Sequence, residues 1–495
     1  MKIIPQIDTY PRLVTFCATP CGRVALLGTF AAALWIDRVR PWPELTVLAG
    51  VLSFLPKYRP ILVSLAALYW LFVHNDWIYW DFVQRMAAAE GQRRDWVLYL
   101  WAGSLLTAIF CGVALFFRYV RGRGGSFLAR RPVLALVSGY VAILVAAGIL
   151  PLHGATRTLL WTFIALLAPY LWFFAYALQD AASKTADTFT LQLGTFHPFY
   201  MATFQSFNPI GKGRAYLRKT AARTTKDLSV VQLKAVKLLL WIAVLERLQQ
   251  LLLVILHGAA WRPVQALSDY AGWRVPSLGV PTLEAALQQT IAGARLPTHL
   301  AWASVIAHFV ESLLGLYVSG NLVVACCRMA GFYILRNTYR PLQAQTIAEF
   351  WNRYYYYFKE LLVEFFFFPT YMRYFKKYRR LRTFAATIAA ATLGNMTYHF
   401  CRDFVYVADM GLSAAVSGFQ VYAFYTLLLG LGIGISQLRS HQAGPVRALP
   451  WGRRLLASVI VMTFFCLLEV FDYEPRSHNL GAHLAFFLNL FSFGG

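Results

Sequence analysis

Charged residues are scarce in this chain of 495 residues. Asp, Glu, Lys and Arg together make up 14% of it, against 58% hydrophobic residues, and the mean hydropathy is +0.51. Soluble domains carry about 25% charged residues. The composition therefore excludes an ordinary soluble protein and predicts an all-α polytopic membrane protein.

Cysteine motifs are missing as well. Of the seven cysteines, most lie inside apolar runs, and none forms a CxxC pair. This pattern is typical of small buried hydrophobic residues and argues against a disulfide or zinc framework. We expect neither a metal nor a bound cofactor.

A cleavable signal peptide is not evident. Residues 1–23 contain Pro5, Pro11 and Pro20, and no compact apolar core there ends in a small-residue cleavage site. We interpret the first apolar run, residues 24–36, as a retained membrane helix.

Acidic residues are outnumbered, 22 against 46 Lys and Arg, which gives a formal net charge of +24. In a soluble protein this excess would suggest nucleic-acid binding. Here the basic residues sit in short loops between apolar runs, and the positive-inside rule explains that arrangement more simply. We expect membrane lipids, and no nucleic acid, as partners.

Apolar runs that could span a bilayer, or nearly so, recur along the whole chain and predict eleven or twelve helices. A straight span needs about 20 residues, so the shorter runs are expected to be tilted, broken or partly inserted. The runs are residues 22–36, 44–56, 61–74, 97–117, 132–151, 158–178, 236–257, 301–325, 383–398, 411–436, 455–471 and 481–493.

Basic loops predict the topology. Placing all of them in the cytoplasm requires an even number of crossings between each pair, which the runs supply, and this favours a cytoplasmic N-terminus. The segment 326–382 then starts and ends in the cytoplasm, so its aromatic part would enter the membrane and return. The basic loops are residues 57–60, 118–131, 212–226, 373–382 and 439–454.

One basic loop contains glycines. Residues 208–219 read NPIGKGRAYLRK, but they lack the P-loop spacing GxxxxGK[ST]. A basic cytoplasmic loop set by topology is the simpler interpretation. An electropositive surface for a phosphorylated or acidic acyl donor is the other.

Two ionisable residues, His308 and Glu311, lie three apart on one face of an expected membrane helix. They could begin a metal site, but such a site needs further ligands, and no second cluster has ligand spacing. A satisfied buried polar pair is favoured. Because acids inside membranes often mark function, these residues are also candidates to line a polar cavity.

A second histidine, His399, lies deep in apolar sequence. Asn395 is four residues earlier on the same helical face, and Arg402 and Asp403 follow within a turn. From these residues alone, a packed structural histidine and a functional one both remain open.

A set of motif residues runs in order through the stretch 315–369 and ends at His399. In chain order they are Ser319-Gly320, Arg328-Met329, Gly331-Phe332, Asn337, Arg340-Pro341, Ala344, Glu349-Phe350-Trp351, Arg353, Glu364, Pro369 and His399. In this set the chain resembles the core of the membrane-bound O-acyltransferase family, closest to the bacterial branch of alginate O-acetyltransferases and D-alanyl transferases. The resemblance covers residues 300–410.

The chain departs from the bacterial pattern at one position. Tyr355 stands where that branch commonly has a second histidine, and Asn352 occupies the place of the asparagine that partners the membrane histidine in the eukaryotic branch. The tyrosine run 354–357 is equally typical of an aromatic belt at a membrane interface.

The resemblance implies acyl transfer to a hydroxyl, with an acyl thioester (acyl-CoA or acyl carrier protein) arriving from the cytoplasm. It implies His399 as general base and Asn352 as its partner, beside a central tunnel formed with re-entrant or in-plane helices. We expect Glu349, Trp351, Arg353 and Tyr355, with His308 and Glu311, to contact substrate.

The expected organisation is one integral-membrane domain, residues 1–495. It comprises N-terminal helices with a basic loop (1–235), a catalytic core (300–410) and C-terminal helices (411–495). A bacterial inner membrane, a polysaccharide or lipid-linked acceptor and a separate extracytoplasmic partner protein fit the resemblance.

Two alternatives to an enzyme remain open. In a transporter or export component, the buried acids Glu311, Asp403, Asp409 and Glu469 would form a pathway. In a non-catalytic relative of the acyltransferases, the same fold would act as a scaffold.

Overall fold

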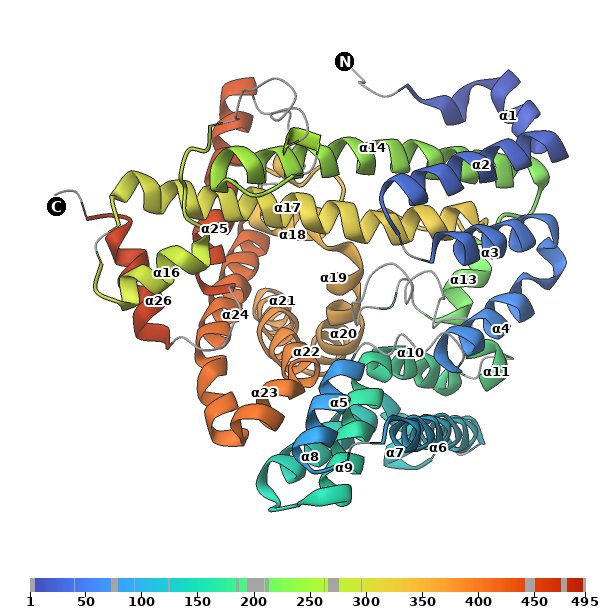
Figure 1. Ribbon diagram of the computed structural model, residues 1–495, viewed down its shortest axis with the longest axis horizontal. Coiled ribbons are helices and arrows are strands. Elements are labelled where there is room, and N and C mark those ends of the chain that lie inside the picture. The colour runs from blue at the N-terminus through green and yellow to red at the C-terminus, as the bar shows by residue number, and fades with distance from the viewer. Residues whose placement is uncertain are drawn as a thin grey trace. The chain divides into compact units, whose positions relative to one another are not determined.

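The structure is a computed structural model of the chain (Figure 1). It describes residues 5–39, 41–72, 79–92, 94–122, 125–183, 187–193, 209, 213–261, 263–265, 276–294, 296–440, 450–472 and 479–492.

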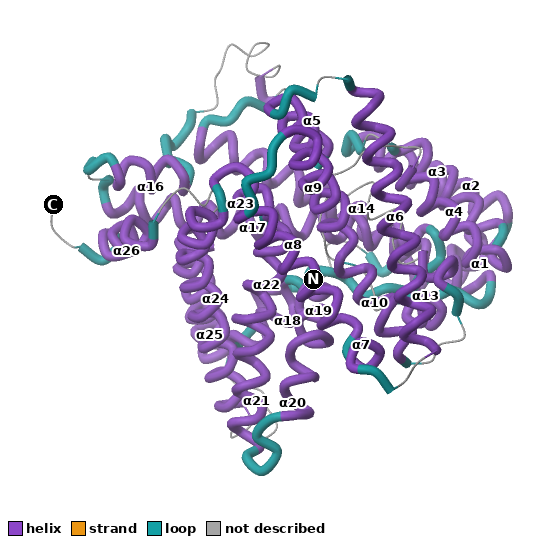
Figure 2. Tube along the Cα trace, turned by 90° about the horizontal axis from the view of Figure 1, so that it is seen from below, coloured by secondary structure: helices purple, strands orange, loops and turns teal. Residues whose placement is uncertain are grey.

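The described residues form helices and no strand; the only extended pairing among them is one isolated bridge between Ala221 and Phe332 (Figure 2). The prediction of an all-α polytopic membrane protein is confirmed. Seven helical stretches are long and apolar enough to cross a bilayer. They are α6 (Asp95–Gly122), α8 (Pro132–Ile149), α9 to α10 (Gly154–Ala182), α14 (Thr225–His257), α17 (Thr298–Met329), α24 (Leu412–Ser440) and α25 (Trp451–Asp472).

Two bent pairs could each form one more span. The helix α1 (Pro11–Ala18) meets α2 (Pro20–Ile36) at 97°, and the bend between α3 (Trp42–Phe54) and α4 (Arg59–Phe72) is 105°. Proline stands at the start of α2 and in the break before α4, where it ends a helix because its ring clashes with the preceding turn.

Seven to nine spans among the described residues are fewer than the eleven or twelve expected. The runs 44–56 and 61–74 became one bent pair. The run 481–493 became the ten-residue helix α26 (Leu480–Asn489). The run 383–398 is divided between α21 (Arg379–Ile388), a π-helical segment (Ala389–Gly394) and α22 (Asn395–Arg402).

The chain forms two compact units, each assembled from three stretches. Unit 1 contains Met1–Leu239, Leu322–Leu335 and Thr397–Ala414, and unit 2 contains Leu240–Asn321, Arg336–Met396 and Ala415–Gly495. The helices α14 and α17 each contribute to both units. The expected core, residues 300–410, is therefore shared between two units rather than forming one body.

Unit 1 has its most buried helix in α10 (Leu171–Ala182). Its residues 171–178 are all buried, which is the pattern of a helix packed on every side. Phe174 of α10 packs edge-on against Phe110 of α6, with ring centroids 5.1 Å apart. This apolar centre supports the short helices α5 (Trp80–Ala89) and α23 (Phe404–Met410), whose Phe82 and Phe404 rings are 5.3 Å apart.

A second part of unit 1 joins the end of α17 to the start of α14. The Ala222 amide donates to the Gly331 carbonyl at 2.8 Å, and the Tyr333 amide donates to the Thr220 carbonyl at 2.7 Å. Gly331 has φ +92°, and a Cβ there would lie 2.7 Å from Arg59 Nη2, so only glycine fits. The turn after α17 is thereby held against α13 (Arg214–Thr220).

Unit 2 holds the aromatic segment in short helices, namely α18 (Ile347–Tyr354), α19 (Tyr356–Leu362), a π-helical segment (Val363–Phe367) and α20 (Phe368–Arg373). None of them is a candidate span. That the segment enters the membrane and returns stays a prediction.

The fixed point of this segment is the buried Asn337. Its amide donates to Asn321 Oδ1 at 3.2 Å, and its carbonyl accepts from the Tyr356 amide at 2.9 Å. Gly320 allows this approach, because a Cβ there would lie 2.2 Å from Asn337 Nδ2. Two of the motif residues thus have a packing role.

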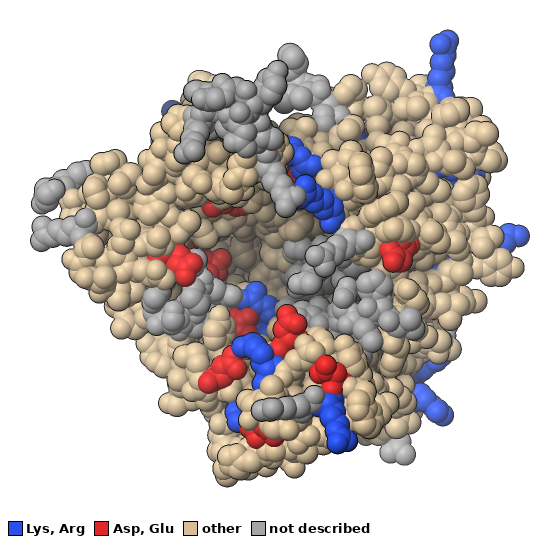
Figure 3. Space-filling view, viewed as in Figure 1, with Lys and Arg blue, Asp and Glu red and all other residues tan. Residues whose placement is uncertain are grey.

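The surface has little charge on the face that Figure 3 draws, where Lys, Arg, Asp and Glu form small groups among uncharged residues. Many large hydrophobic side chains are exposed, among them Trp35, Leu115 and Val459. Lipid tails can cover such residues without cost, so this surface suits a membrane protein.

Candidate functional site

His399 lies in α22, and the backbone of this helix is held by tyrosines from elsewhere in unit 1. Tyr79 donates its hydroxyl to the Arg402 carbonyl at 2.8 Å, and Tyr140 donates to the Cys401 carbonyl at 3.0 Å. These bonds satisfy carbonyl groups at a helix end that have no partner within the helix. The last turn of α22, which carries His399, is therefore fixed on two sides.

Aromatic rings flank the imidazole. The Tyr398 ring is edge-on to that of His399 at 5.2 Å, and Trp172 of α10 stacks on Tyr398 at 5.8 Å. The His399 side chain is 13% exposed. It is thus mostly enclosed by apolar groups yet still accessible.

An acidic residue follows one turn later. Asp403 Oδ2 lies 4.0 Å from His399 Nδ1, and the Asp403 side chain is 7% exposed. Arg402 binds the same carboxylate twice, through Nε at 2.5 Å and Nη2 at 3.2 Å. The carboxylate is therefore balanced by a guanidinium while one of its oxygens faces the imidazole.

This arrangement suits a base. At 4.0 Å the carboxylate is beyond hydrogen-bond distance of Nδ1, so it acts on the imidazole as a nearby charge. A neutral imidazole can accept a proton and become an imidazolium. The same carboxylate stabilises the imidazolium that results. The sequence had indicated Asp403 as a charge near His399 and as one of the acids of a possible transport pathway.

The helix α18 carries most of the other predicted site residues. Its N-terminus is capped by Thr346, whose hydroxyl accepts from the Glu349 amide at 3.1 Å. Glu349 in turn accepts from the Gln345 amide at 2.8 Å and pairs with Arg353 at 2.5 Å. Thr346 and Glu349 thus close the helix start in the manner of a capping box, with Glu349 reaching back to the Gln345 amide.

The remaining motif residues of α18 divide by burial. Trp351 is buried and meets the Phe358 ring at 6.3 Å, and Phe350 stacks on Phe465 at 3.8 Å. Asn352 is exposed, and Tyr355, at the end of α18, is partly buried against Phe358. Asn352 and Tyr355 therefore present polar groups, whereas Trp351 is part of the packing.

Tyr354 of the same helix lies near the acidic residues Glu469 and Asp472. Burial raises the pKa of Tyr354 well above its usual range, and the charges of Glu469 and Asp472 add to this. Its hydroxyl therefore stays protonated and can only act as a neutral hydrogen-bond group. Its backbone carbonyl accepts from the Thr338 hydroxyl at 2.7 Å.

His308 and Glu311 do not bind one another. Glu311 Oε1 lies 2.9 Å from Nε2 of His257 in α14, and His308 Nε2 lies 3.5 Å from Glu469 Oε2 in α25. Ser312 also donates to Glu469, at 3.5 Å. The expected single buried pair is replaced by two His–Glu pairs that join α17 to different helices.

The partners of these residues were missed by sequence reasoning. His257 stands at the end of an apolar run and gave no functional signal, and Glu469 appeared only among acids of a possible transport pathway. A weak signal existed, since both lie at the polar end of an apolar run. Within the described residues, no group of three or more His, Cys, Asp and Glu is arranged to hold a metal ion.

The predicted catalytic residues belong to different units. His399 is part of unit 1, and Asn352 is part of unit 2 with the other six predicted site residues. That the two act together stays a prediction.

The chain matches no model of a known protein family and no curated protein. The resemblance to the membrane-bound O-acyltransferases therefore rests on the ordered motif residues and His399.

Proposed function

We propose that the chain is an integral-membrane O-acyltransferase. It would move an acyl group, probed most simply as acetyl, from a thioester to a hydroxyl of a cell-envelope polysaccharide or lipid-linked glycan. A bacterial inner membrane and a thioester donor on the cytoplasmic side complete the proposal. The observation that carries it is His399, enclosed but accessible, with the Asp403 carboxylate 4.0 Å from its Nδ1.

In the proposed reaction His399 Nε2 takes the proton of the acceptor hydroxyl as its oxygen attacks the thioester carbonyl. The negative charge that develops on the carbonyl oxygen needs a donor, for which Asn352 and Tyr355 are the candidates from the motif. Collapse of the intermediate forms the ester and breaks the carbon–sulfur bond. The imidazolium then returns its proton to the leaving thiolate, so the histidine is regenerated.

The test is transfer of labelled acetyl from acetyl-CoA to the polysaccharide fraction of membranes that contain the protein. We expect His399→Ala to lower the rate at least 100-fold, since general bases contribute about 10²- to 10⁴-fold. His299→Ala is the matched control, because His299 is exposed and lies at the start of α17. Its rate should equal that of the wild type.

Two results would argue against the proposal. Wild-type activity in a stably folded His399→Ala variant would remove the assigned base. A wild-type protein that binds no thioester donor would favour the scaffold.

The two His–Glu pairs favour a second candidate, a proton-coupled transporter. Intramembrane acids paired with histidines are typical of proton relays, and Glu311 and Glu469 both lie within candidate spans. Proteoliposomes with a pH-sensitive dye inside and an imposed potassium gradient measure the expected proton flux. Glu469→Gln should abolish it, whereas Glu284→Gln, outside the spans, should not. Flux no greater than that of empty liposomes would exclude this candidate.

A further inference from the structure

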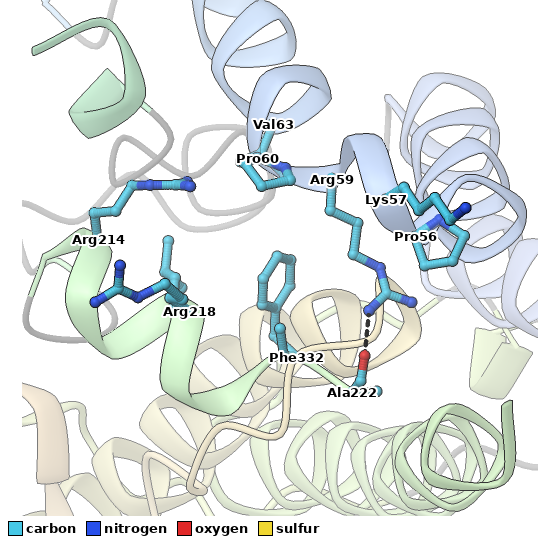
Figure 4. Close-up of a pocket in the computed structure, with 11 residues that line it drawn as sticks. Pro56, Lys57, Arg59, Pro60, Val63, Arg214, Arg218, Ala222 and Phe332 are labelled. Atoms are coloured by element: carbon cyan, nitrogen blue, oxygen red, sulfur yellow. Dashed lines mark hydrogen bonds between the residues drawn. The ribbon is translucent and has the colours of Figure 1, made fainter. Parts of the chain in front are cut away.

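A small basic pocket lies in unit 1, and no predicted site residue is among the residues that line it. Its volume is about 150 Å³. Pockets for drug-sized ligands are larger, about 300 to 1,000 Å³, so this one suits a small group. The described residues that line it are Pro56, Lys57, Arg59, Pro60, Val63, Arg214, Leu217, Arg218, Ala221, Ala222 and Phe332 (Figure 4). Four of these carry a cationic side chain and none is acidic.

The four cationic side chains differ in burial. Arg59 and Arg214 are buried, at 3% and 8% exposure, whereas Lys57 and Arg218 are exposed. In Figure 4 the Arg214 side chain extends from α13 toward Pro60, and Arg59 comes from the start of α4 and turns down to Ala222. The pocket thus has two guanidinium groups inside and two further cations at its rim.

Among the described residues, only backbone carbonyls bind the charge of Arg59. Its Nε donates to the Leu52 carbonyl at 2.8 Å and its Nη1 to the Ala222 carbonyl at 3.0 Å. Among the described residues no carboxylate forms an ion pair with Arg59. Carbonyl dipoles orient the group but leave a net buried charge, which is costly.

Arg214 is only partly balanced. Its Nε lies 3.7 Å from Asp187 Oδ2, beyond hydrogen-bond distance, and this buried Nε makes no hydrogen bond. Burial lowers the pKa of Arg214, Asp187 raises it, and the neighbouring charge of Arg218 lowers it again. The site therefore has unused donor capacity and excess positive charge.

The pocket floor is fixed. Phe332 and Ala221 form the isolated bridge, and the Ala222 amide donates to Gly331. Gln232 of α14 donates to the Met329 carbonyl at 2.9 Å and to the Ser53 hydroxyl at 2.7 Å. These bonds tie α3, α14 and α17 together, so the backbone around Arg59 is held in place before any ligand binds.

The place of the pocket along the helices indicates its surroundings. It lies where the candidate span α14 begins, where α17 ends and at the break before α4. Helix ends of spans lie near the boundary between the hydrocarbon and the headgroups. Phosphate groups of lipids are found at this boundary. A single Arg side chain can bind two oxygens of a phosphate through two parallel hydrogen bonds.

We propose that Arg59 and Arg214, with Lys57 and Arg218 at the rim, form a binding site for a phosphate group, which at this depth is the phosphomonoester headgroup of an anionic lipid. A soluble phosphomonoester has the same chemistry and is the other source. The site is independent of acyl transfer, because no residue of the proposed reaction lines it. The loop residues 210–212, including Lys212 of the glycine-rich stretch, lie outside the described residues.

The experiment measures binding by calorimetry with the full chain in an uncharged detergent at constant ionic strength. The probes are dioctanoyl phosphatidic acid, dioctanoyl phosphatidylcholine and glycerol 3-phosphate. We expect phosphatidic acid to bind at least tenfold more tightly than phosphatidylcholine. If glycerol 3-phosphate binds as tightly as phosphatidic acid, the pocket is still a phosphate site, but its ligand is a soluble phosphate compound.

Variants locate the binding. Arg214→Gln should weaken phosphatidic acid binding at least tenfold, Arg218→Gln about threefold, and Arg214→Lys less than Arg214→Gln. Lys219→Gln is the matched control, because this substitution also removes one positive charge. Lys219 is exposed and does not line the pocket. Its affinity should change less than twofold. If Arg214→Gln does not fold, Arg218→Gln provides the same comparison at the rim.

Two outcomes would overturn the proposal. One is a wild-type protein that binds neither phosphatidic acid nor glycerol 3-phosphate. The other is an equal loss of affinity in Arg218→Gln and Lys219→Gln, which would reduce the effect to general surface charge. Because the readout is binding, failure of acyl transfer would not affect either result.

Discussion

The Asp403 carboxylate binds Arg402 and lies 4.0 Å from Nδ1 of His399. If His399 is the base, Asp403 acts by stabilising its charged form. We expect Asp403→Asn to lower kcat about 10- to 100-fold at constant KM, a smaller loss than for His399→Ala. Asp403→Glu should recover part of the rate. If Asp403→Asn and Asp403→Glu lowered kcat and raised KM to the same extent, the role of Asp403 would be structural only.

Glu90 gives a prediction on pH. Its carboxylate accepts from the Gly154 amide at 2.6 Å and from Arg157 at 2.7 Å, and these bonds, the backbone one first, lower the pKa of Glu90 below its usual range. A lowered folded-state pKa means stability that is present above the unfolded-state pKa of about 4.5 and lost as the pH falls through the folded value.

The stability difference between wild type and Glu90→Gln tests this. Thermal unfolding in detergent should show the variant less stable at pH 7 and the difference shrinking as the pH falls below 4.5. Arg157→Gln should show the same trend. A difference that stays constant from pH 7 to pH 3 would contradict the assignment.

At the scale of elements, the close approach of α17 to the turn at Asn337 depends on Gly320. Asn337 is 2% exposed and hydrogen bonded, so it has little room to yield to a Cβ 2.2 Å away. We expect Gly320→Ala to destabilise the protein by about 1 to 3 kcal/mol through overpacking. Gly315→Ala in the same helix meets only Gln249, at 3.4 Å, and should be neutral or gain up to about 1 kcal/mol from helix propensity. Denaturation in dodecyl sulfate measures both, and equal effects would contradict the packing argument.

The helices that the sequence predicted well are those whose apolar runs are long and uninterrupted. The run 132–151 corresponds to α8, and the run 411–436 to α24, because length and hydropathy alone decide such spans. The run 383–398 was harder. It contains a π-helical segment in which Gly394 lies against Phe366, a contact that no periodicity encodes.

The candidate site shows the same limit. The pairing of Glu349 with Arg353 follows from their spacing of four, and the sequence placed Asp403 within a turn of His399. The contact of His308 with Glu469 joins residues on α17 and α25 that are far apart in the chain. Tertiary packing decides such pairs, and a single sequence does not encode them locally.

At the scale of the whole molecule, the two long helices α14 and α17 define the sides of the membrane. They contain 33 and 32 residues, about 50 Å each at 1.5 Å per residue, so each crosses a hydrocarbon core of about 30 Å. Lys226 at the start of α14 and Tyr339 beyond α17 must then lie on one side. Gln289, between the two helices, must lie on the other.

The predicted return of the segment 326–382 adds a fourth position, Arg380. We expect a membrane-impermeant maleimide to label single cysteines at 226, 339 and 380 from one side and at 289 from the opposite side, in a variant without the seven native cysteines. All four positions are exposed, so lack of labelling reports the side and not burial. The basic residues at 373–382 favour the side that also holds Lys226, because positive loops are retained in the cytoplasm. Labelling of position 380 together with position 289 would mean that the aromatic segment crosses the membrane, and the helices after it would then have the opposite orientation.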